Sequence, residues 1–196
     1  GSRTRHHTVA HGKSRVLLGR FTSSVECAAP LRTISSESTM KSSVYIETSV
    51  LSYLMARPSN DLRAMANQSV TAEWWETQKD HYSLVASELV ISEAGRGHPE
   101  AAQRRLAVVN SLPLLQVSQQ AQELAQALIQ EYALPQKAEG DALHVALAAV
   151  NGVEYLLTWN CTHIANAHTR PKIEATCRAH GYEPPVICTP LELMEN

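Results

Sequence analysis

Four polar side chains stand where the sequence indicates that a strand has just ended or a helix is beginning: Glu47, Glu93, Asp141 and Asn160. Each lies beside an apolar run rather than within a cluster of solvated charges. Carboxylates that share one cleft repel one another, and a divalent cation relieves that repulsion. Oxygen-only ligand sets suit Mg²⁺ or Mn²⁺, and two such ions about 3.5–4 Å apart support in-line cleavage of a phosphodiester. The residue types therefore predict hydrolysis of a phosphoryl substrate.

The same acids also have structural interpretations. Asp141 at the start of a helix is placed to cap that helix or to interact with its dipole. Glu93 suits the solvated face of an amphipathic helix. Each acid is ambiguous when taken singly, and their shared position relative to the strands is what favours a site.

The elements that must position these residues alternate between strand-like and helix-like runs. We expect strands at residues 43–46, 82–86, 114–117, 154–158 and 186–188. We expect helices from about Val50 with Thr48 or Ser49 as the cap, at residues 62–79, 88–96, 99–110, 119–132 after a Ser118 cap, 139–150 and 171–179, and a terminal helical turn at Thr189-Pro190. Such alternation predicts an α/β fold with a mainly parallel central sheet, whose ligands lie beyond the carboxyl ends of the strands.

Length and composition limit the class of protein. A chain of 196 residues, 44% hydrophobic and 18% charged, is long enough for one ordinary domain with its own core. No run approaches the ~18 consecutive apolar residues of a membrane span. The four cysteines form no C-x-x-C pair, which is typical of cytosolic thiols rather than of a disulfide scaffold. We therefore expect a cytoplasmic protein without a membrane anchor.

Residues 1–39 differ from the rest in charge and patterning. They hold six Lys or Arg against two acids, a net charge of +4, so residues 40–196 carry −6 of the total of −2. We expect an unstructured leader: Gly1-Ser2 resembles a tag scar, and Met40 directly before a strand-like run suggests that the remainder is upstream translated sequence, with a transit peptide as the alternative. Residues 40–196 are expected to form a single domain, acidic enough to need bridging cations or a local basic rim to bind nucleic acid.

Four short motifs follow one another along that body. They are VYIETS at 44–49, SE at 92–93, DALHVALA at 141–148 and TWN at 158–160. In order and spacing they resemble the motifs of the PIN-domain family, and most closely those of the VapC-type toxins of bacterial toxin–antitoxin pairs. The resemblance covers about residues 41–193 and none of the leader.

Membership of this family implies a three-layer α/β/α PIN-like fold and a Mg²⁺- or Mn²⁺-dependent endoribonuclease, the toxin of a type II pair. Carried over by position, the catalytic and metal-ligating residues are Glu47, Glu93, Asp141 and Asn160. The residues in supporting roles are Thr48, Thr158, His144 and His163. The resemblance also implies an RNA substrate, a small antitoxin protein as partner, and a homodimer.

Two positions depart from the family pattern. Glu47 stands where the family usually has Asp, and the extra methylene shifts a metal ligand by about 1.5 Å. Asn160 stands where many members have Asp; it keeps an oxygen ligand but removes a charge, so a second ion should bind more weakly. The alternative function is therefore a catalytically weak PIN-like module that binds RNA or a partner. A phosphotransfer domain is disfavoured, because it needs an Asp nucleophile at position 47.

Histidines and cysteines near these motifs allow further interpretations. His144 lies one helical turn after Asp141, where it could orient Asp141 or contact a phosphate. The favoured interpretation is a hydrogen-bonded histidine at the edge of the core. His163 is the better candidate to line the site. A zinc set made from Cys161, His163, Cys177 and His180 is disfavoured by its spacing.

Aromatic and basic side chains have similar alternatives. Trp74 and Trp75 either stack on bases or, as favoured, anchor the long helix with one indole packed inside and one partly exposed. Three arginines have two interpretations, a basic rim for RNA phosphates or, as preferred, a solvated helix face. They are Arg96, Arg104 and Arg105.

Overall fold

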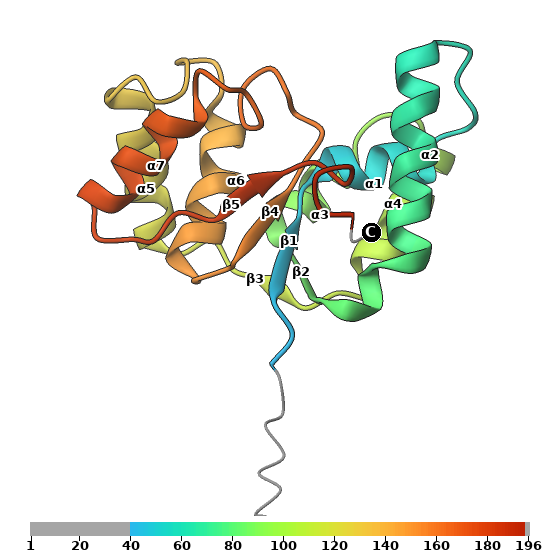
Figure 1. Cartoon of the computed structure of the whole chain (residues 1–196), viewed down its shortest axis with the longest axis horizontal. Helices are drawn as coiled ribbons and strands as arrows, with labels where there is room; N and C mark the ends of the chain where they lie inside the picture. The colour runs from blue at the N-terminus through green and yellow to red at the C-terminus, as the bar shows by residue number, and fades with distance from the viewer. Residues whose placement is uncertain (1–39, 195–196) are drawn as a thin grey trace, which may run out of the picture. The chain divides into compact units, whose positions relative to one another are not determined.

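The computed structural model describes residues 40–194, so the expectations for residues 1–39 lie outside the described part of the chain. Strands and helices alternate along it (Figure 1). In chain order the elements are β1 (Ser43–Ile46), α1 (Thr48–Met55), α2 (Leu62–Thr77), the 3₁₀ turn η1 (Lys79–His81), β2 (Ser83–Ser87), α3 (Glu88–Ala94), α4 (Pro99–Val109), β3 (Leu114–Leu115), α5 (Gln119–Gln130), α6 (Glu139–Val150), β4 (Tyr155–Leu157), α7 (Arg170–Ala179) and β5 (Val186–Cys188).

The five strands form one sheet in the order β3-β2-β1-β4-β5, and every neighbouring pair is parallel. β1 lies at the centre, where Tyr45 is paired with Val85 on one side and Leu156 on the other. The chain builds outward from β1 through β2 to β3, and then crosses to the far side of β1 to add β4 and β5. The strand order therefore reverses between β1 and β4, the place where open parallel sheets bind their ligands.

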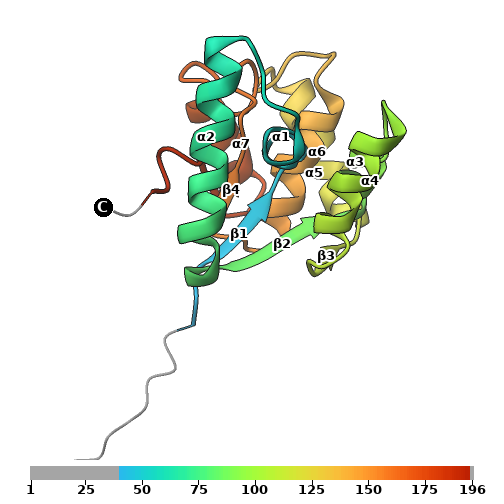
Figure 2. The ribbon, with the colours of Figure 1, turned by 90° about the vertical axis from the view of Figure 1, so that its right-hand side faces the viewer.

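Helices cover both faces of the sheet, as the two views show (Figures 1 and 2). The helices α1, α2, α3 and α4 lie on one face, with α1 in contact with the other three. The helices α5, α6 and α7 lie on the opposite face and pack on one another through α5. The expected three-layer α/β/α arrangement is confirmed, and its sheet is wholly rather than mainly parallel. Within residues 40–194, no helix is long and apolar enough to cross a membrane.

The core is formed where the buried sheet meets the apolar sides of the helices. The inner strand residues Val44, Tyr45 and Ile46 have no exposed surface, as is typical of a central strand covered on both faces. Trp74 of α2 is also fully buried, and its indole nitrogen donates to the Leu193 carbonyl at 3.2 Å. Trp75 remains partly exposed. The prediction that the two tryptophans anchor the long helix, one inside and one partly exposed, is confirmed.

Several boundaries differ from those expected. Glu47, rather than Thr48 or Ser49, is the cap of α1, because its side chain accepts a hydrogen bond from the Ser49 amide. The expected terminal helical turn at Thr189-Pro190 is present as a single turn, in which the Leu193 amide donates to the Thr189 carbonyl at 3.1 Å. β3 has two residues rather than four, since only Leu114 and Leu115 pair with β2. The Ser118 cap of α5 is confirmed.

Candidate metal centre

The reversal point of the sheet places the ends of β1 and β4 side by side. Ile46 is paired with Leu157, and the Glu47 amide donates to the Leu157 carbonyl at 3.1 Å. The next residue of each strand end is therefore also adjacent, and Thr158 Oγ1 donates to Glu47 Oε2 at 2.7 Å. Two motifs that are more than one hundred residues apart in sequence meet here for a purely topological reason.

Glu47 is held in one orientation by several donors. Its side chain is 6% exposed. Oε1 accepts from the Ser49 amide at 3.1 Å, and Oε2 accepts from the Ser49 hydroxyl as well as from Thr158. Ser49 Oγ in turn accepts from the Trp159 amide at 2.8 Å. Hydrogen-bond donors around a buried carboxylate offset the free-energy cost of removing it from water. The donors around Glu47 therefore stabilise its burial and also fix the direction of its free lone pairs.

Glu93 reaches the same place from α3. Its Oε2 accepts from Thr48 Oγ1 at 2.5 Å and from His144 Nε2 at 3.0 Å. Burial by itself raises the pKa of this half-buried carboxyl, but the hydrogen bonds from His144 and Thr48, with the nearby positive charge of Arg96, outweigh burial and lower its pKa below 4.5. Glu93 is therefore ionised at neutral pH.

His144 lies beneath the two acids and is 1% exposed. Because a carboxylate only accepts, His144 Nε2 carries the proton that it shares with Glu93. The other ring nitrogen, Nδ1, is 2.8 Å from the Tyr45 hydroxyl, which is itself 2.6 Å from Ser87 Oγ. Burial raises the pKa of Tyr45 far above its usual value, so the phenol keeps its proton. With the shared proton of His144 on Nε2, the Tyr45 hydroxyl is placed to donate to Nδ1. His144 is the hydrogen-bonded core histidine favoured by the sequence.

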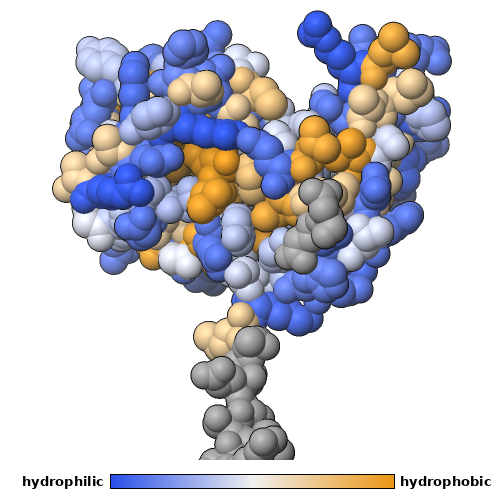
Figure 3. Space-filling model, viewed as in Figure 1, coloured by the Kyte–Doolittle hydropathy of each residue, from blue (hydrophilic) through white to orange (hydrophobic). Residues whose placement is uncertain are grey.

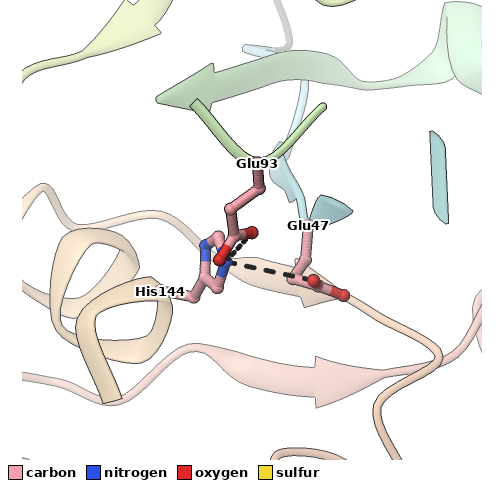
Figure 4. A group of neighbouring side chains, drawn as sticks. All are labelled: Glu47, Glu93 and His144. Carbon is pink, nitrogen blue, oxygen red and sulfur yellow. Dashed lines mark hydrogen bonds and ion pairs between the residues drawn. The ribbon is translucent and has the colours of Figure 1, made fainter. Parts of the chain in front are cut away.

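Glu47, Glu93 and His144 form the one cluster of metal-ligating side chains found among residues 40–194, with one ligand atom of each within 4.8 Å of the others (Figure 4). The histidine proton already points to Glu93, so the two carboxylates are the better ligands. Glu93 Oε1 accepts no hydrogen bond from the described residues and lies 3.4 Å from the position that a Cβ on Gly140 would take. Oxygen donors of this kind fit a hard divalent cation such as Mg²⁺ or Mn²⁺.

Asp141 and Asn160 lie beside this cluster but are joined to a different residue. Asp141, in the first turn of α6, has its Oδ2 2.6 Å from His163 Nδ1. Asn160 Oδ1 accepts from the His163 amide at 3.1 Å. The structure therefore brings two of the four expected ligands into direct proximity, Glu47 and Glu93. It gathers the other two around His163.

The hydroxyl positions are occupied much as the motifs suggest. Thr48 donates to Glu93 and Thr158 donates to Glu47, so each acid has one threonine beside it. The sequence interpretation considered Ser49 only as a helix cap and gave no role in the site to Ser49, Tyr45 or Ser87. The spacing of Ser49, two residues after an acid that ends a strand, is a detectable capping signal. Tyr45 and Ser87 offered no such signal, because their contact depends on β2 lying beside β1.

The zinc alternative is not assembled in the described structure. Cys177 is buried, which raises the pKa of its thiol to about 11, whereas Cys161 is exposed. His163 is bonded to Asp141, and His180 Nε2 is 2.8 Å from Glu131 Oε1. The two histidines thus bond to different acids, and the four residues form no ligand cluster among the described residues.

The interpretation of the arginines as a solvated helix face is wrong for two of the three. Arg104 Nε donates to the Met55 carbonyl at 3.1 Å, and Arg105 Nε donates to the Ala94 carbonyl at 3.1 Å. Both side chains are half-buried. Each bonds the last carbonyls of a neighbouring helix, which is a favourable position for a cation.

Comparison with known proteins gives a limited result. No family model matches the chain, and no curated protein sequence matches it significantly. Among solved structures it is similar to the Mycobacterium tuberculosis toxin VapC20, described as cleaving the sarcin-ricin loop, with 16% sequence identity and a TM-score of 0.49 over 72% of this chain and 99% of that one. It is also similar to VapBC2 from Rickettsia felis, solved bound to a DNA fragment from its promoter, with 14% identity and a TM-score of 0.43 over 75% of this chain and 98% of that one.

Proposed function

We propose that this chain is a PIN-like, metal-dependent endoribonuclease and the VapC-type toxin of a type II toxin–antitoxin pair. The observation that carries the proposal is the meeting of Glu47 and Glu93 at the reversal point of the sheet, where Glu93 keeps one oxygen without a donor. Three of the four sequence motifs that resemble the PIN family supply these acids and their threonines, and the fourth, at 141–148, supplies His144, which bonds to Glu93.

In this proposal Mg²⁺ or Mn²⁺, when bound, supplies a Lewis acid that activates water and neutralises charge on the phosphate. Glu47 and Glu93 hold the ion, and the donors on each carboxylate restrict where its free oxygen points. Asp141, in the first turn of α6, and Asn160, in the loop after β4, provide the other two oxygen-bearing side chains of the site.

His163 has a distinct position in this arrangement. Its Nδ1 donates to Asp141, and its side chain is 21% exposed. Because Nδ1 is committed to Asp141, the other ring nitrogen, Nε2, remains for a further hydrogen bond. We assign His163 the task of hydrogen-bonding the RNA next to the metal centre.

The proposed partners follow from the same resemblance. They are an RNA substrate, a small antitoxin protein and a second copy of the chain, in a cytoplasmic setting. Co-purification of this chain with the product of an adjacent small gene, followed by inhibition of cleavage in the complex, tests the antitoxin. Sedimentation of the chain alone tests the homodimer.

One observation favours the second candidate, a catalytically weak module that binds RNA or a partner. Glu47 Oε2 is engaged by both Ser49 and Thr158, and Asn160 contributes no charge, so few acidic oxygens remain for a second ion. Two-metal hydrolysis needs both ions. A one-metal site would bind RNA and cut it slowly.

The test is cleavage of a panel of tRNA and structured RNA with Mg²⁺ or Mn²⁺, with chelator, and with Asp141→Asn and Asp80→Asn variants. Asp80 is 82% exposed, and its carboxylate pairs with Lys79 rather than with a residue of the cluster, so its variant is the matched control. We expect metal-dependent cutting that chelator and Asp141→Asn abolish and Asp80→Asn leaves intact. Folded protein that binds Mn²⁺ without cutting any RNA would favour the binding module. Cutting that persists in Asp141→Asn would remove Asp141 from the mechanism.

A further inference from the structure

Two adjoining cavities run along α1. The first, of about 550 Å³, lies between α1 and the start of α2, and Ser49 and Tyr53 are among its lining residues. The second, of about 300 Å³, lies between α1 and α4. Ser52, Ala56 and Arg57 line both cavities, so the two adjoin along α1, and together they are called the α1 groove. Figure 3 shows the surface hollowed near α1, beside α2.

The α1 groove begins at the metal centre. Ser49 lines its first cavity and also donates its hydroxyl hydrogen to Glu47. From Ser49 to Ala56 the groove follows α1 for seven residues, which corresponds to about 10 Å of helix. A linear ligand whose reactive bond lies at Glu47 and Glu93 is thus able to continue into the groove.

The far half of the α1 groove is cationic. Arg57, Arg104 and Arg105 line the second cavity, with Glu100 as its acid. Glu100 is paired with Arg57 at 2.8 Å. The excess of positive charge is local, because residues 40–196 as a whole carry −6.

Two of these arginine side chains are already fixed in orientation by hydrogen bonds to backbone carbonyls. Arg104 donates from Nε to the Met55 carbonyl, and its terminal N–H groups make no hydrogen bond with the described residues, so they remain available. Arg105 bonds the Ala94 carbonyl through Nε and the Arg96 carbonyl through one terminal nitrogen at 2.6 Å. A guanidinium fixed on one edge presents its free edge with little further loss of entropy, which suits bidentate contact with a phosphate.

We infer that the α1 groove binds the sugar–phosphate backbone of one RNA strand on one side of the bond that is cut, with Arg104 and Arg105 contacting successive phosphates. The inference rests on the proposed nuclease function. Tyr53 in the half nearer the metal centre offers an aromatic face for a base, and the small side chains of Ser52 and Ala56 leave room for the backbone. An acidic protein segment is the competing ligand, but the arginine forks next to a phosphodiester site favour the nucleic acid.

The test measures binding without cleavage. A fluorescently labelled single-stranded RNA is titrated with the full chain in chelator, and the anisotropy is followed over a series of salt concentrations. The variant is Arg104→Gln with Arg105→Gln. The matched control is Lys172→Gln with Arg178→Gln, which removes the same charge from exposed positions of α7 on the opposite face of the sheet.

We expect the groove variant to bind RNA more weakly and to lower the slope of log K against log salt by about 1.4, because each phosphate contact on a single strand contributes about 0.7. The control should keep the slope of the original chain. Because Arg104 and Arg105 also bond helix ends, Arg57→Gln is included as a second variant. Its side chain is 78% exposed, so the fold should tolerate the change, and removal of one positive charge that lines the groove should weaken RNA binding and lower the slope by less than the loss of Arg104 and Arg105 does.

Three outcomes would overturn the inference: no RNA binding by the unaltered chain, equal slopes for the groove variants and the unaltered chain, or an equal loss in the α7 control. If the same variants lose binding to poly-glutamate while their RNA binding is unchanged, the groove would be assigned to a protein partner instead. Groove-dependent RNA binding without any metal-dependent cutting would support the groove and contradict the nuclease function. The two proposals therefore fail separately.

Discussion

The hydroxyl of Tyr45 lies 2.8 Å from Nδ1 of His144, and both side chains are almost completely buried. This contact is the middle of a chain of hydrogen bonds from Ser87 through Tyr45 and His144 to Glu93. A residue in the centre of the sheet thereby orients a carboxylate at its edge. His144 acts as a positioning residue for Glu93, since its Nε2 proton is committed to that acid.

Replacing Tyr45 by Phe should interrupt this chain without changing the shape of the core. His144 Nδ1 would be left without a partner in a buried place, which costs about 1–3 kcal/mol, whereas Ser87 would keep the Val90 amide at 3.3 Å. We expect the free energy of unfolding in urea to fall by about that amount. Mn²⁺ affinity should fall as well, because Glu93 loses its fixed orientation.

Tyr132→Phe is the matched control for that variant. Tyr132 is 82% exposed, and loss of its hydroxyl should change the free energy of unfolding by less than about 0.5 kcal/mol. Equal stabilities of Tyr45→Phe and the unaltered chain would contradict a stabilising hydrogen bond between Tyr45 and His144. A ¹⁵N spectrum of the histidines gives an independent readout, since His144 should carry a proton on Nε2, the nitrogen bonded to Glu93.

Much of this architecture was predictable from the sequence, because it depends on local patterns. The central strand Ser43–Ile46 and the helix Glu139–Val150 have the expected bounds, since their apolar runs end at polar residues. The position of Glu47 at the carboxyl edge followed from its place after the first strand. The short β3 was less predictable, since its length depends on pairing with β2 rather than on its own side chains.

The detailed contacts of the site were less predictable, because they depend on long-range neighbours. Asp141 was expected beside the other acids, but its carboxylate is bonded to His163, which the loop after β4 brings within 2.6 Å. The sequence indicates only an ordinary strand residue at Tyr45, because its contact with Ser87 depends on β2 lying beside β1. Such side-chain directions are decided by packing between elements that are distant in sequence.

Mn²⁺ should stabilise the protein through Glu93. A ligand at one hundred times its Kd raises the free energy of unfolding by about 2.7 kcal/mol. We expect the Tm of the unaltered chain to rise with Mn²⁺ and that of Glu93→Gln to rise much less. Glu88→Gln is the control, because Glu88 is an exposed residue of the same helix α3. An equal rise in Glu93→Gln would place the ion elsewhere.

Gly140→Ala should separate stability from metal binding. Gly140 is in the first turn of α6, and an alanine there restricts the unfolded chain, which stabilises a helix by about 0.4–1 kcal/mol. The added methyl would lie 3.4 Å from Glu93 Oε1, the oxygen assigned to the ion. We expect higher stability in urea and weaker Mn²⁺ binding by calorimetry. Unchanged Mn²⁺ affinity would show that the ion does not approach Oε1.

The described cysteines should differ strongly in reactivity. Burial raises the pKa of Cys177 to about 11 and that of Cys188 to about 12, so both stay protonated at neutral pH, whereas Cys161 is exposed. In a Cys27→Ser background, a thiol reagent at neutral pH should modify one cysteine rapidly, and Cys161→Ser should abolish that phase. A rapid phase that survives in the double variant would mean that a buried thiol is accessible.

The pH dependence of stability should report the bond between Glu192 and Arg170. Burial opposes ionisation of Glu192, but Arg170 at 3.2 Å and the Thr189 amide at 2.8 Å outweigh it and lower its pKa below 4.5. A lowered folded pKa means that the stabilisation is complete above the unfolded pKa and is lost as the pH falls through the folded one. The side chain is 48% exposed, so screening limits the effect to about 0.5–1 kcal/mol.

Glu192→Gln should therefore lower the free energy of unfolding by that amount at neutral pH, and the difference from the unaltered chain should shrink as the pH falls below about 4.5. Urea unfolding at closely spaced pH values measures both quantities. Glu174→Gln is the comparison, because Glu174 has a single contact at 3.5 Å with the exposed Arg178 and should change stability less. The difference in stability between Glu192→Gln and the unaltered chain could instead stay constant down to strongly acidic pH. That result would show that the charge of Glu192 does not stabilise the turn. The carboxyl group would then act only as a neutral hydrogen-bond acceptor for Thr189.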